Sequence, residues 1–382
     1  MKIVFLQQRC FLQTKKHTNP LFDSIIRVCD DNGIDWQVWL TDRNLPTGYP
    51  QKNVRKYGWR NSLITAGLLF FNRLCKIPPN NSYKILHYIL KTFKILDNDI
   101  SLFFTNGLYQ VKELSILYPG IKIIEVQHGI LYPTHMGYFT SDGTLLQDFL
   151  LAKHLIFWLF GENYKNFFLQ NKTNALELSQ RIETIGDVKR TDNHLIKINS
   201  PLKSIVIASQ LVEDAIFSAD DVCRMKSIYE NALDMIYSTL NNTNNSHVFS
   251  VIFRHHPRFF NCIDLSDWNN KYPSLVMNDT RDWDEIYPET KCLLTISSTS
   301  AFDAAAYGVP TVIINAHHKK FRNILVEDFN YPHPHLTLEK CLSMDTASYE
   351  KIRLTTNSWY KSFYSTFSPT VCKELLYKAI NT

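Results

Sequence analysis

One stretch of the sequence decides the fold: T-I-S-S-T-S-A-F-D-A-A-A-Y-G-V-P-T-V-I-I, from Thr295 to Ile314. A short apolar strand leads into consecutive hydroxyl residues, and small alanine residues then build a tightly packed helix. Gly308 ends this helix and Pro310 prevents its extension, so the next strand follows at once. A strand, a helix and a strand in such close succession predict a parallel α/β unit.

The same alternation of short apolar runs and helical patterns extends along both halves of the chain. Strands are predicted at 3–6, 36–40, 102–105 and 121–126, and again at 204–208, 248–253, 292–296 and 311–314. This pattern predicts an α/β protein with two doubly wound, Rossmann-like domains that face each other across a cleft. We expect an N-terminal domain at 1–190, a C-terminal domain at 200–355, and a C-terminal helix at 356–382 that crosses back onto the first domain.

Composition restricts the classes of partner. The 382 residues are 45% hydrophobic and 20% charged, which is a globular composition. We interpret the net charge of +5 as a mild excess spread along the chain, without the Lys/Arg block of a nucleic-acid-binding arm. A weakly basic face is compatible with an anionic substrate and with peripheral contact at the inner face of a membrane. We therefore expect no nucleic-acid partner.

Cysteine usage and missing motifs point to a cytoplasmic enzyme without a cofactor. The eight cysteines are scattered and form no C-x-x-C pair, which indicates thiols in a reducing compartment. No apolar run has the length of a membrane span. The sequence contains no D-x-D triad in a suitable loop, no G-x-G-x-x-G and no Walker-type loop, which argues against a metal site, a dehydrogenase and an NTPase.

Two segments of the second half are rich in groups that bind phosphate. F-R-H-H-P-R-F begins at Phe253 and places Arg254 and His256 after a predicted strand, although a solvated basic loop is the alternative. Hydroxyls beside the free N–H groups of a helix N-terminus also form an anion site, although a plain serine N-cap explains them too. The hydroxyl run consists of Ser297, Ser298, Thr299 and Ser300.

The first half contains the candidate for acid–base chemistry. The segment I-E-V-Q-H-G-I-L-Y-P-T-H-M-G-Y extends from Ile124, and its predicted strand ends just before His128. Imidazole is the natural base near neutral pH, and Glu125 is placed to orient it or to act as a base itself. His135 and Tyr138 are predicted to complete an acceptor pocket. A structural histidine is the alternative interpretation.

A fourth segment, A-S-Q-L-V-E-D-A-I, directly follows the first strand of the second domain. Gln210 and Glu213 are candidates for contacts with the sugar, and Asp214 is a candidate nucleophile, base or sugar ligand. An acidic helix N-terminus, which favours the helix dipole in any protein, is the alternative.

These motifs together resemble GT-B glycosyltransferases of bacterial surface polysaccharides. The pair His256-Pro257 followed by Ser297-Ser298 is similar to the H-P and S/T motifs of transferases that use CMP-activated sugars, such as sialyltransferases and β-Kdo transferases. The resemblance implies that His256, Ser297 and Ser298 contact the nucleotide phosphate. It also implies a metal-independent transfer of Kdo or a related acid sugar to a lipopolysaccharide, capsule or O-antigen glycan.

A second resemblance to these transferases, and one difference from them, concern the chemical step. The segment from Gln210 to Ala215 resembles a Q-V-E-D-D-A stretch of retaining β-Kdo transferases, which implies that Asp214 forms a glycosyl-enzyme adduct. Related enzymes carry an acidic-acidic-Gly motif where this chain has Gln127-His128-Gly129. The histidine either replaces the carboxylate as base or marks a different donor or a different stereochemical course.

Three other functions remain open at this point. The first is a glycosyltransferase that uses a UDP-, GDP- or dTDP-hexose donor. The second is a sugar-nucleotide 2-epimerase, which would have the same two-domain architecture. The third is a non-catalytic glycan- or nucleotide-binding partner in an assembly complex.

Overall fold

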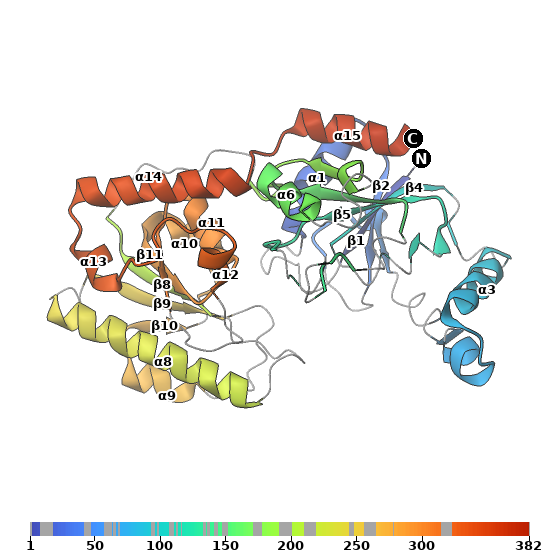
Figure 1. Ribbon diagram of the computed structural model, residues 1–382. Helices are drawn as coiled ribbons and strands as arrows, with labels where there is room; N and C mark the ends of the chain where they lie inside the picture. The colour runs from blue at the N-terminus through green and yellow to red at the C-terminus, as the bar shows by residue number, and fades with distance from the viewer. Residues whose placement is uncertain are drawn as a thin grey trace. The chain divides into compact units, whose positions relative to one another are not determined.

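The computed structural model describes most of the chain, and all structural statements below concern these residues (Figure 1). They are 2–7, 18–41, 47–56, 63, 66–67, 69–92, 96–97, 99–106, 111, 114–115, 117–132, 135, 138–140, 144–146, 152–170, 178–190, 201–209, 219–243, 248–255, 265–277, 279–314 and 323–381. The chain forms two compact units, which we call the N-terminal unit (Met1–Asp192 and Phe363–Thr382) and the C-terminal unit (Asn193–Ser362).

The N-terminal unit is built on a parallel sheet of seven strands in the order β3-β2-β1-β4-β5-β6-β7. The strands are β1 (Lys2–Gln7), β2 (Trp36–Leu40), β3 (Val54–Lys56), β4 (Ile100–Thr105), β5 (Lys122–Val126), β6 (Leu155–Leu159) and β7 (Ile182–Thr184). The helical elements are α1 (Pro20–Asp31), η2 (Gln51–Asn53), η3 (Phe70–Leu74), α3 (Pro79–Thr92), α6 (Glu162–Leu169) and α15 (Pro369–Asn381).

The C-terminal unit contains a second parallel sheet, of five strands in the order β10-β9-β8-β11-β12. The strands are β8 (Ser204–Ala208), β9 (Ser250–Arg254), β10 (Leu275–Met277), β11 (Thr290–Thr295) and β12 (Thr311–Ile313). The helical elements are α8 (Ala219–Asn242), α9 (Ser266–Lys271), α10 (Trp283–Ile286), η4 (Tyr287–Glu289), α11 (Ser300–Ala306), α12 (Ile324–Glu327), α13 (Leu338–Ser343) and α14 (Thr346–Phe363). The prediction of two doubly wound α/β domains is confirmed.

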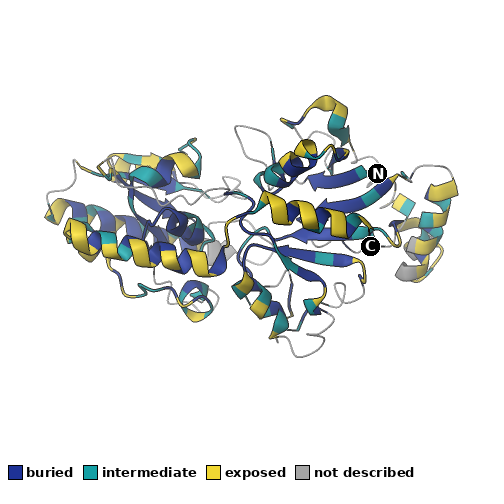
Figure 2. Cartoon of the chain, turned by 90° about the horizontal axis from the view of Figure 1, so that it is seen from above, coloured by how far each residue is buried: buried dark blue, intermediate teal, exposed yellow. Residues whose placement is uncertain are grey.

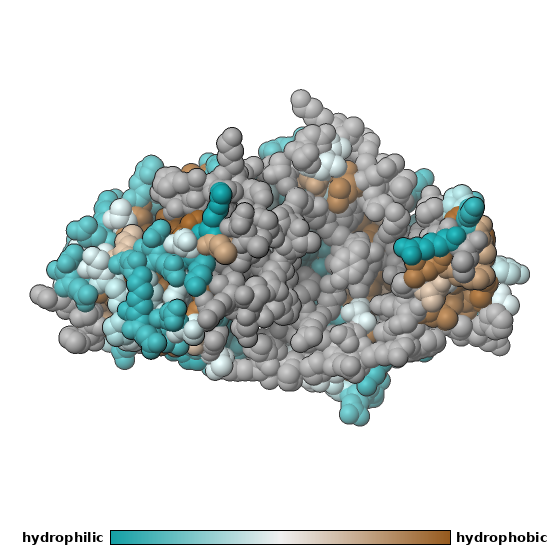
Figure 3. Space-filling view, turned by 90° about the horizontal axis from the view of Figure 1, so that it is seen from below, coloured by the Kyte–Doolittle hydropathy of each residue, from teal (hydrophilic) through white to brown (hydrophobic). Residues whose placement is uncertain are grey.

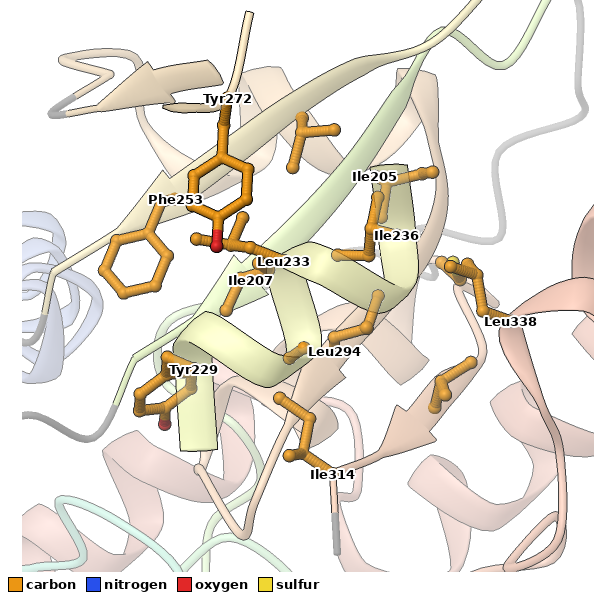
Figure 4. Packing of buried hydrophobic residues seen from close by; sticks show 14 of the residues in the cluster. Ile205, Ile207, Tyr229, Leu233, Ile236, Phe253, Tyr272, Leu294, Ile314 and Leu338 are labelled. Atoms are coloured by element: carbon orange, nitrogen blue, oxygen red, sulfur yellow. The ribbon is translucent and has the colours of Figure 1, made fainter. Parts of the chain in front are cut away.

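Burial explains why the central strands are almost continuously apolar. Figure 2 shows both sheets as largely buried, with exposed residues on the helices that surround them. A parallel strand covered on both faces needs apolar residues at every position rather than at alternate ones. In the C-terminal unit, Ile205 and Ile207 of β8 pack with Leu233 and Ile236 of α8 in one cluster, with Leu294 of β11 beside them (Figure 4).

The C-terminal helices divide between the two units. In α14, the Asn357 amide donates to the carbonyl oxygen of Ala306 at 2.7 Å, and the Trp359 indole donates to that of Phe329 at 2.7 Å. These bonds attach α14 to the C-terminal unit. Residues 356–362, which we expected on the first domain, therefore lie in the C-terminal unit.

The return to the N-terminal unit begins just after α14. The Ser365 N–H donates to the carbonyl oxygen of Phe160 at 2.8 Å, and the Asp187 N–H donates to that of Ser365 at 2.8 Å. Next, α15 packs against α1 (Figure 1). The end of α14 also lies close to the residue that precedes α6, because a Cβ at Gly161 would lie 2.0 Å from the Phe363 carbonyl oxygen.

The substitution Gly186→Ala tests this close approach. Gly186 has a φ of +87°, and a Cβ there would lie 2.5 Å from the Thr366 carbonyl oxygen. Gly33→Ala is the matched control, because Gly33 has a φ of +64° but open space around its Cβ. We expect Gly33→Ala to cost about 1–2 kcal/mol through backbone strain. Gly186→Ala should cost a further ~1–3 kcal/mol through the steric clash. Urea denaturation followed by tryptophan fluorescence measures both, and equal losses would contradict the close packing.

Candidate functional site

The candidate acid–base group of the N-terminal unit is a cluster of three side chains, Glu125, His128 and Tyr138. The Tyr138 hydroxyl donates to Glu125 Oε1 at 3.2 Å and lies 3.4 Å from His128 Nδ1. His128 Nδ1 is itself 3.5 Å from Glu125 Oε1. The structure therefore brings into contact three residues that the sequence analysis singled out within one segment.

Burial differs sharply within this cluster. The Glu125 side chain is fully buried in β5, whereas 24% of the His128 side chain is exposed. His128 thus joins a buried carboxyl group to the protein surface. Glu125 Oε2 has no hydrogen-bond partner among the described residues, which is an uncommon state for a buried carboxyl oxygen and is typical of functional sites.

The electrostatics of Glu125 follow from this burial. Desolvation raises the pKa of the Glu125 carboxyl group, and the hydrogen bond and charge interaction with His128 oppose the rise. Burial and the adjacent Glu125 raise the pKa of Tyr138 well above its usual value, so the phenol remains a hydrogen-bond donor. A carboxyl group in such surroundings can orient an imidazole and stabilise its protonated form.

The turn that presents His128 is held by the side chain of Gln127, a role that the sequence analysis missed. Gln127 Oε1 accepts from the Phe160 N–H at 2.8 Å, and Gln127 Nε2 donates to the Gly129 carbonyl oxygen at 2.7 Å. These bonds fix both sides of His128 to the end of β6. The available signal in the sequence was a polar residue directly after an apolar strand. In the structure, Gln127 is only 1% exposed.

His135 is partly buried and packs beside the cluster. Its ring packs edge-on between Tyr132 and Tyr138, with centroid distances of 5.1 Å and 5.3 Å. Burial, followed by the charge of His128, lowers the pKa of His135 to about 4. His135 is therefore neutral near pH 7, and its position supports Tyr138.

Two further polar residues, Gln7 and Asn106, lie at the carboxyl ends of adjacent strands. Gln7 ends β1, and Asn106 directly follows β4, at the point where the strand order of this sheet reverses. Ligands of open α/β sheets bind at such a reversal. Both side chains are fully buried, and both amide groups have no hydrogen-bond partner among the described residues. The sequence shows only that a polar residue ends an apolar strand at each position, and this did not indicate its burial.

In the C-terminal unit, the hydroxyl run forms a compact turn between β11 and α11. Ser298 Oγ donates to Ser300 Oγ at 3.1 Å and accepts from the Ser300 N–H at 3.2 Å. The next two N–H groups, of Ala301 and Phe302, donate to the carbonyl oxygens of Ser298 and Thr299 at 3.0 Å and 2.9 Å. The turn thus uses these three N–H groups internally, so a phosphate here would meet mainly hydroxyl groups.

Arg254 ends β9 at the same sheet edge as this turn. Its Nη1 donates to the carbonyl oxygens of Asp279 and Arg281 at 2.8 Å and 2.5 Å, and its guanidinium group lies 4.6 Å from the Trp283 ring centroid. These contacts fix the orientation of the guanidinium group. His256, Gln210, Glu213 and Asp214 lie outside the described residues.

The strand order of the second sheet makes neighbours of the two strands that precede the candidate segments. The order reverses between β8 and β11, the strands that precede the Gln210–Asp214 segment and the Ser297–Ser300 turn. The Thr295 hydroxyl donates to the Ala208 carbonyl oxygen at 3.0 Å and joins the two strand ends. The reversal point is the expected place for a ligand.

A cavity of about 210 Å³ lies at the opposite end of the N-terminal sheet. Its lining includes Lys122, His154 and Arg181, at the amino ends of β5, β6 and β7. It therefore does not belong to the Glu125–His128 cluster. The described residues include no group of three or more His, Cys, Asp or Glu side chains placed to hold a metal ion, and no helix long and apolar enough to cross a membrane.

Comparison with solved structures identifies the fold. A variant of the wall teichoic acid polymerase TagF, soaked with CDPG, aligns with a TM-score of 0.57 at 15% identity over 100% of this chain and 89% of that chain. S. aureus MnaA with UDP gives 0.53 at 9% identity, over 100% and 96%. UDP-GlcNAc 2-epimerase from Neisseria meningitidis, bound to UDP-GlcNAc, gives 0.51 at 11% identity over the whole of both chains.

These likenesses confirm the predicted GT-B-type fold of two parallel α/β domains. At such low identity they establish the fold alone. No protein-family model matches the sequence, and no curated protein matches it.

The substitution His135→Gln tests the partly buried, neutral imidazole. Histidine in an unfolded chain titrates near pH 6.5, about its reference value, whereas folded His135 stays neutral down to about pH 4. The unfolded state therefore binds more protons in this window, and the folded state loses stability as the pH falls through it. The variant should lack this loss, which is on the order of 3 kcal/mol.

Urea denaturation across this pH window measures the effect. His154→Gln is the control for the substitution itself, because His154 is an exposed histidine of the same unit. Identical slopes for the wild type and His135→Gln would contradict the assignment.

Proposed function

We propose that this protein is a transferase that moves a group from a nucleotide-activated donor to an acceptor hydroxyl, with His128 as general base. The observation that supports this most strongly is the pairing of the partly exposed His128 with the fully buried Glu125 carboxyl group. Such a pair is costly to keep in a protein interior unless it has a function.

In the proposed step, the acceptor hydroxyl loses its proton to His128 Nε2 while its oxygen attacks the donor. The ring is held through Nδ1 by Glu125 and Tyr138. The Glu125 carboxylate then stabilises the imidazolium that forms, as the acid does in a Ser-His-Asp triad. The departing nucleotide keeps the bonding electron pair, and its phosphate requires donors such as the hydroxyls of Ser297 and Ser298.

The donor that we favour is a CMP-activated acid sugar such as Kdo, and the favoured acceptor is a lipopolysaccharide or capsule glycan. This choice depends on the resemblance of His256-Pro257 and Ser297-Ser298 to the motifs of CMP-sugar transferases. The fold neighbours include structures with CDPG, UDP and UDP-GlcNAc. The donor nucleotide is therefore the first property to test.

Asp214 has a different proposed role from His128. In a double displacement Asp214 would attack the sugar first, displace the nucleotide and form a covalent adduct. The acceptor hydroxyl, activated by His128, would then attack this adduct and release Asp214. In a single displacement Asp214, with Gln210 and Glu213, would instead bind the sugar. Arg254 would contribute positive charge at the same sheet edge.

A sugar-nucleotide 2-epimerase is the second candidate, because a solved UDP-GlcNAc 2-epimerase shares this fold. UDP-GlcNAc 2-epimerase from Neisseria meningitidis aligns over the whole of both chains. The two functions differ in one requirement: transfer needs an acceptor, whereas epimerisation does not.

The substitution His128→Ala tests the proposed base. We expect it to lower acceptor-dependent turnover by about 10²–10⁴-fold, the usual contribution of general acid–base catalysis, and to leave donor binding nearly unchanged. Glu125→Gln keeps the shape but loses the charge, so we expect a fall in kcat and an altered pH profile. His154→Ala is the control, because this exposed histidine lies at the other end of the sheet.

The measurement is release of nucleotide from a labelled donor with and without acceptor. Turnover of His128→Ala at the wild-type rate would refute the assignment of the base. Conversion of the donor without any acceptor would favour the epimerase.

A thermal-shift panel with CMP, CDP, UDP, GDP and dTDP tests the donor. A ligand that binds only the folded state stabilises it by about 2.7 kcal/mol when its concentration is 100 times its Kd. This stabilisation raises the midpoint temperature of unfolding. We expect the largest shift with CMP, reduced in a Ser297→Ala/Ser298→Ala variant. A selective response to UDP or GDP would exclude the CMP-sugar assignment.

A further inference from the structure

Positive charge is concentrated in one part of this chain. Residues 43–96 contain ten Lys and Arg residues and no Asp or Glu, namely Arg43, Lys52, Arg55, Lys56, Arg60, Arg73, Lys76, Lys84, Lys91 and Lys94. The whole chain has 41 basic and 36 acidic residues, so the remainder has 31 basic and 36 acidic ones. The interpretation of a mild excess spread along the chain is therefore wrong.

The same segment exposes large apolar side chains. Leu63 is 40% exposed, Leu69 46%, Phe70 51% and Tyr88 72%. They are four of the ten large hydrophobic residues that are exposed among the described residues. Single exposed apolar residues are ordinary, but a group of them marks an interaction surface.

The two faces of α3 show how this surface is formed. Leu86 and Leu90 are buried, and His87 Nδ1 lies 2.7 Å from the Leu117 carbonyl oxygen, which attaches this side to the N-terminal unit. Lys84, Tyr88 and Lys91 are exposed, and their spacing of four and three residues places them on one face of the helix. Tyr88 is thus flanked by lysines along an outward face.

The η3 helix and its flanks have the same character. Phe70 and Phe71 pack against each other with a centroid distance of 5.3 Å, and Arg73 and Lys76 are exposed close by in the sequence. Figure 3 shows apolar atoms gathered at the side of the molecule where Figure 1 places α3, with hydrophilic side chains lying across them. We call the exposed residues of η3 and α3 the η3–α3 surface.

We propose that the η3–α3 surface docks the protein on a lipid bilayer with anionic headgroups. Aromatic and aliphatic side chains enter the boundary between headgroups and acyl chains, where Lys and Arg keep their charges at the phosphates. Each basic residue near an anionic surface strengthens the attraction. Residues 43–96 contain no acidic residue, and of their basic side chains Arg55 is paired with Asp97, which lies just outside this segment.

Charge selects this partner over two others. A second copy of the chain would bring two positive surfaces together, and like charges disfavour such a contact. A duplex nucleic acid would match the charge, but its paired and stacked bases would leave Leu69, Phe70 and Tyr88 without an apolar partner. An anionic bilayer satisfies the charge and the apolar side chains together.

This inference is independent of the proposed function, because binding to lipid requires neither donor nor acceptor. It adds a location to that function: an acceptor carried on a lipid would be held at the surface to which the enzyme binds. Failure of lipid binding and failure of catalysis would be seen in separate assays.

The test is flotation of the full chain with vesicles of phosphatidylcholine alone, or of phosphatidylcholine and phosphatidylglycerol in equal parts. We expect binding to the anionic vesicles only, and weaker binding as salt is added. Lys84→Gln with Lys91→Gln should lower the partition coefficient about 5-fold for each charge removed. Phe70→Ser should lower it without changing the salt dependence.

Matched controls come from exposed residues elsewhere. Leu354→Ser removes an apolar side chain of nearly the same exposure, 50% against 51% for Phe70. Lys351→Gln with Lys373→Gln removes two exposed lysines outside residues 43–96. Both controls should bind like the wild type, and circular dichroism confirms that each variant is folded.

Three outcomes would overturn the proposal. The first is no binding to anionic vesicles. The second is equal loss of binding in the test variants and the controls. The third is a wild-type chain that binds no vesicles but forms a dimer in light scattering, with the dimer abolished by Phe70→Ser. The η3–α3 surface would then be a contact between copies of the chain.

Discussion

Parallel strand pairing is the constraint on which both units depend. It places the carboxyl ends of all the strands of a sheet at one edge. In the N-terminal sheet this edge holds Gln7, Asn106 and the Glu125–His128 pair, and in the C-terminal sheet it holds Arg254 and the turn from Ser297. Residues that lie far apart in the sequence are brought to the same edge without any motif that connects them. The strand order then decides which of them are neighbours.

The central strands were predictable because burial on both faces leaves a strong mark in the sequence. The predicted strands at 3–6 and 204–208 agree closely with β1 and β8, whose residues are almost all buried. Three of the four edge strands, β3, β7 and β10, have only three residues each and contain polar or exposed positions, whereas the fourth, β12, is as short but more buried and was predicted. The pairing of β3, β7 and β10 depends on the neighbouring strand, so no local pattern indicates them.

The candidate site was predictable to the extent that its residues are close in the sequence. Glu125 and His128 are three residues apart, so one segment pointed to both. The tertiary contact between Gln127 and Phe160, which holds the turn, had no such local mark. The same is true of the buried amide groups of Gln7 and Asn106, because a polar residue after a strand usually begins an exposed loop. Their burial comes from the strand order alone.

The distribution of the last twenty residues has a consequence for synthesis on the ribosome. The N-terminal unit includes Phe363–Thr382. The packing of α15 against α1 therefore needs residues that are translated after the entire C-terminal unit. The C-terminal sheet can fold as its own strands leave the ribosome. The N-terminal unit cannot complete its packing until α15 has been made, and one side of α1 remains uncovered until then. Contacts of such long sequence separation form slowly. The half of the molecule that is made first is therefore the half that is completed last.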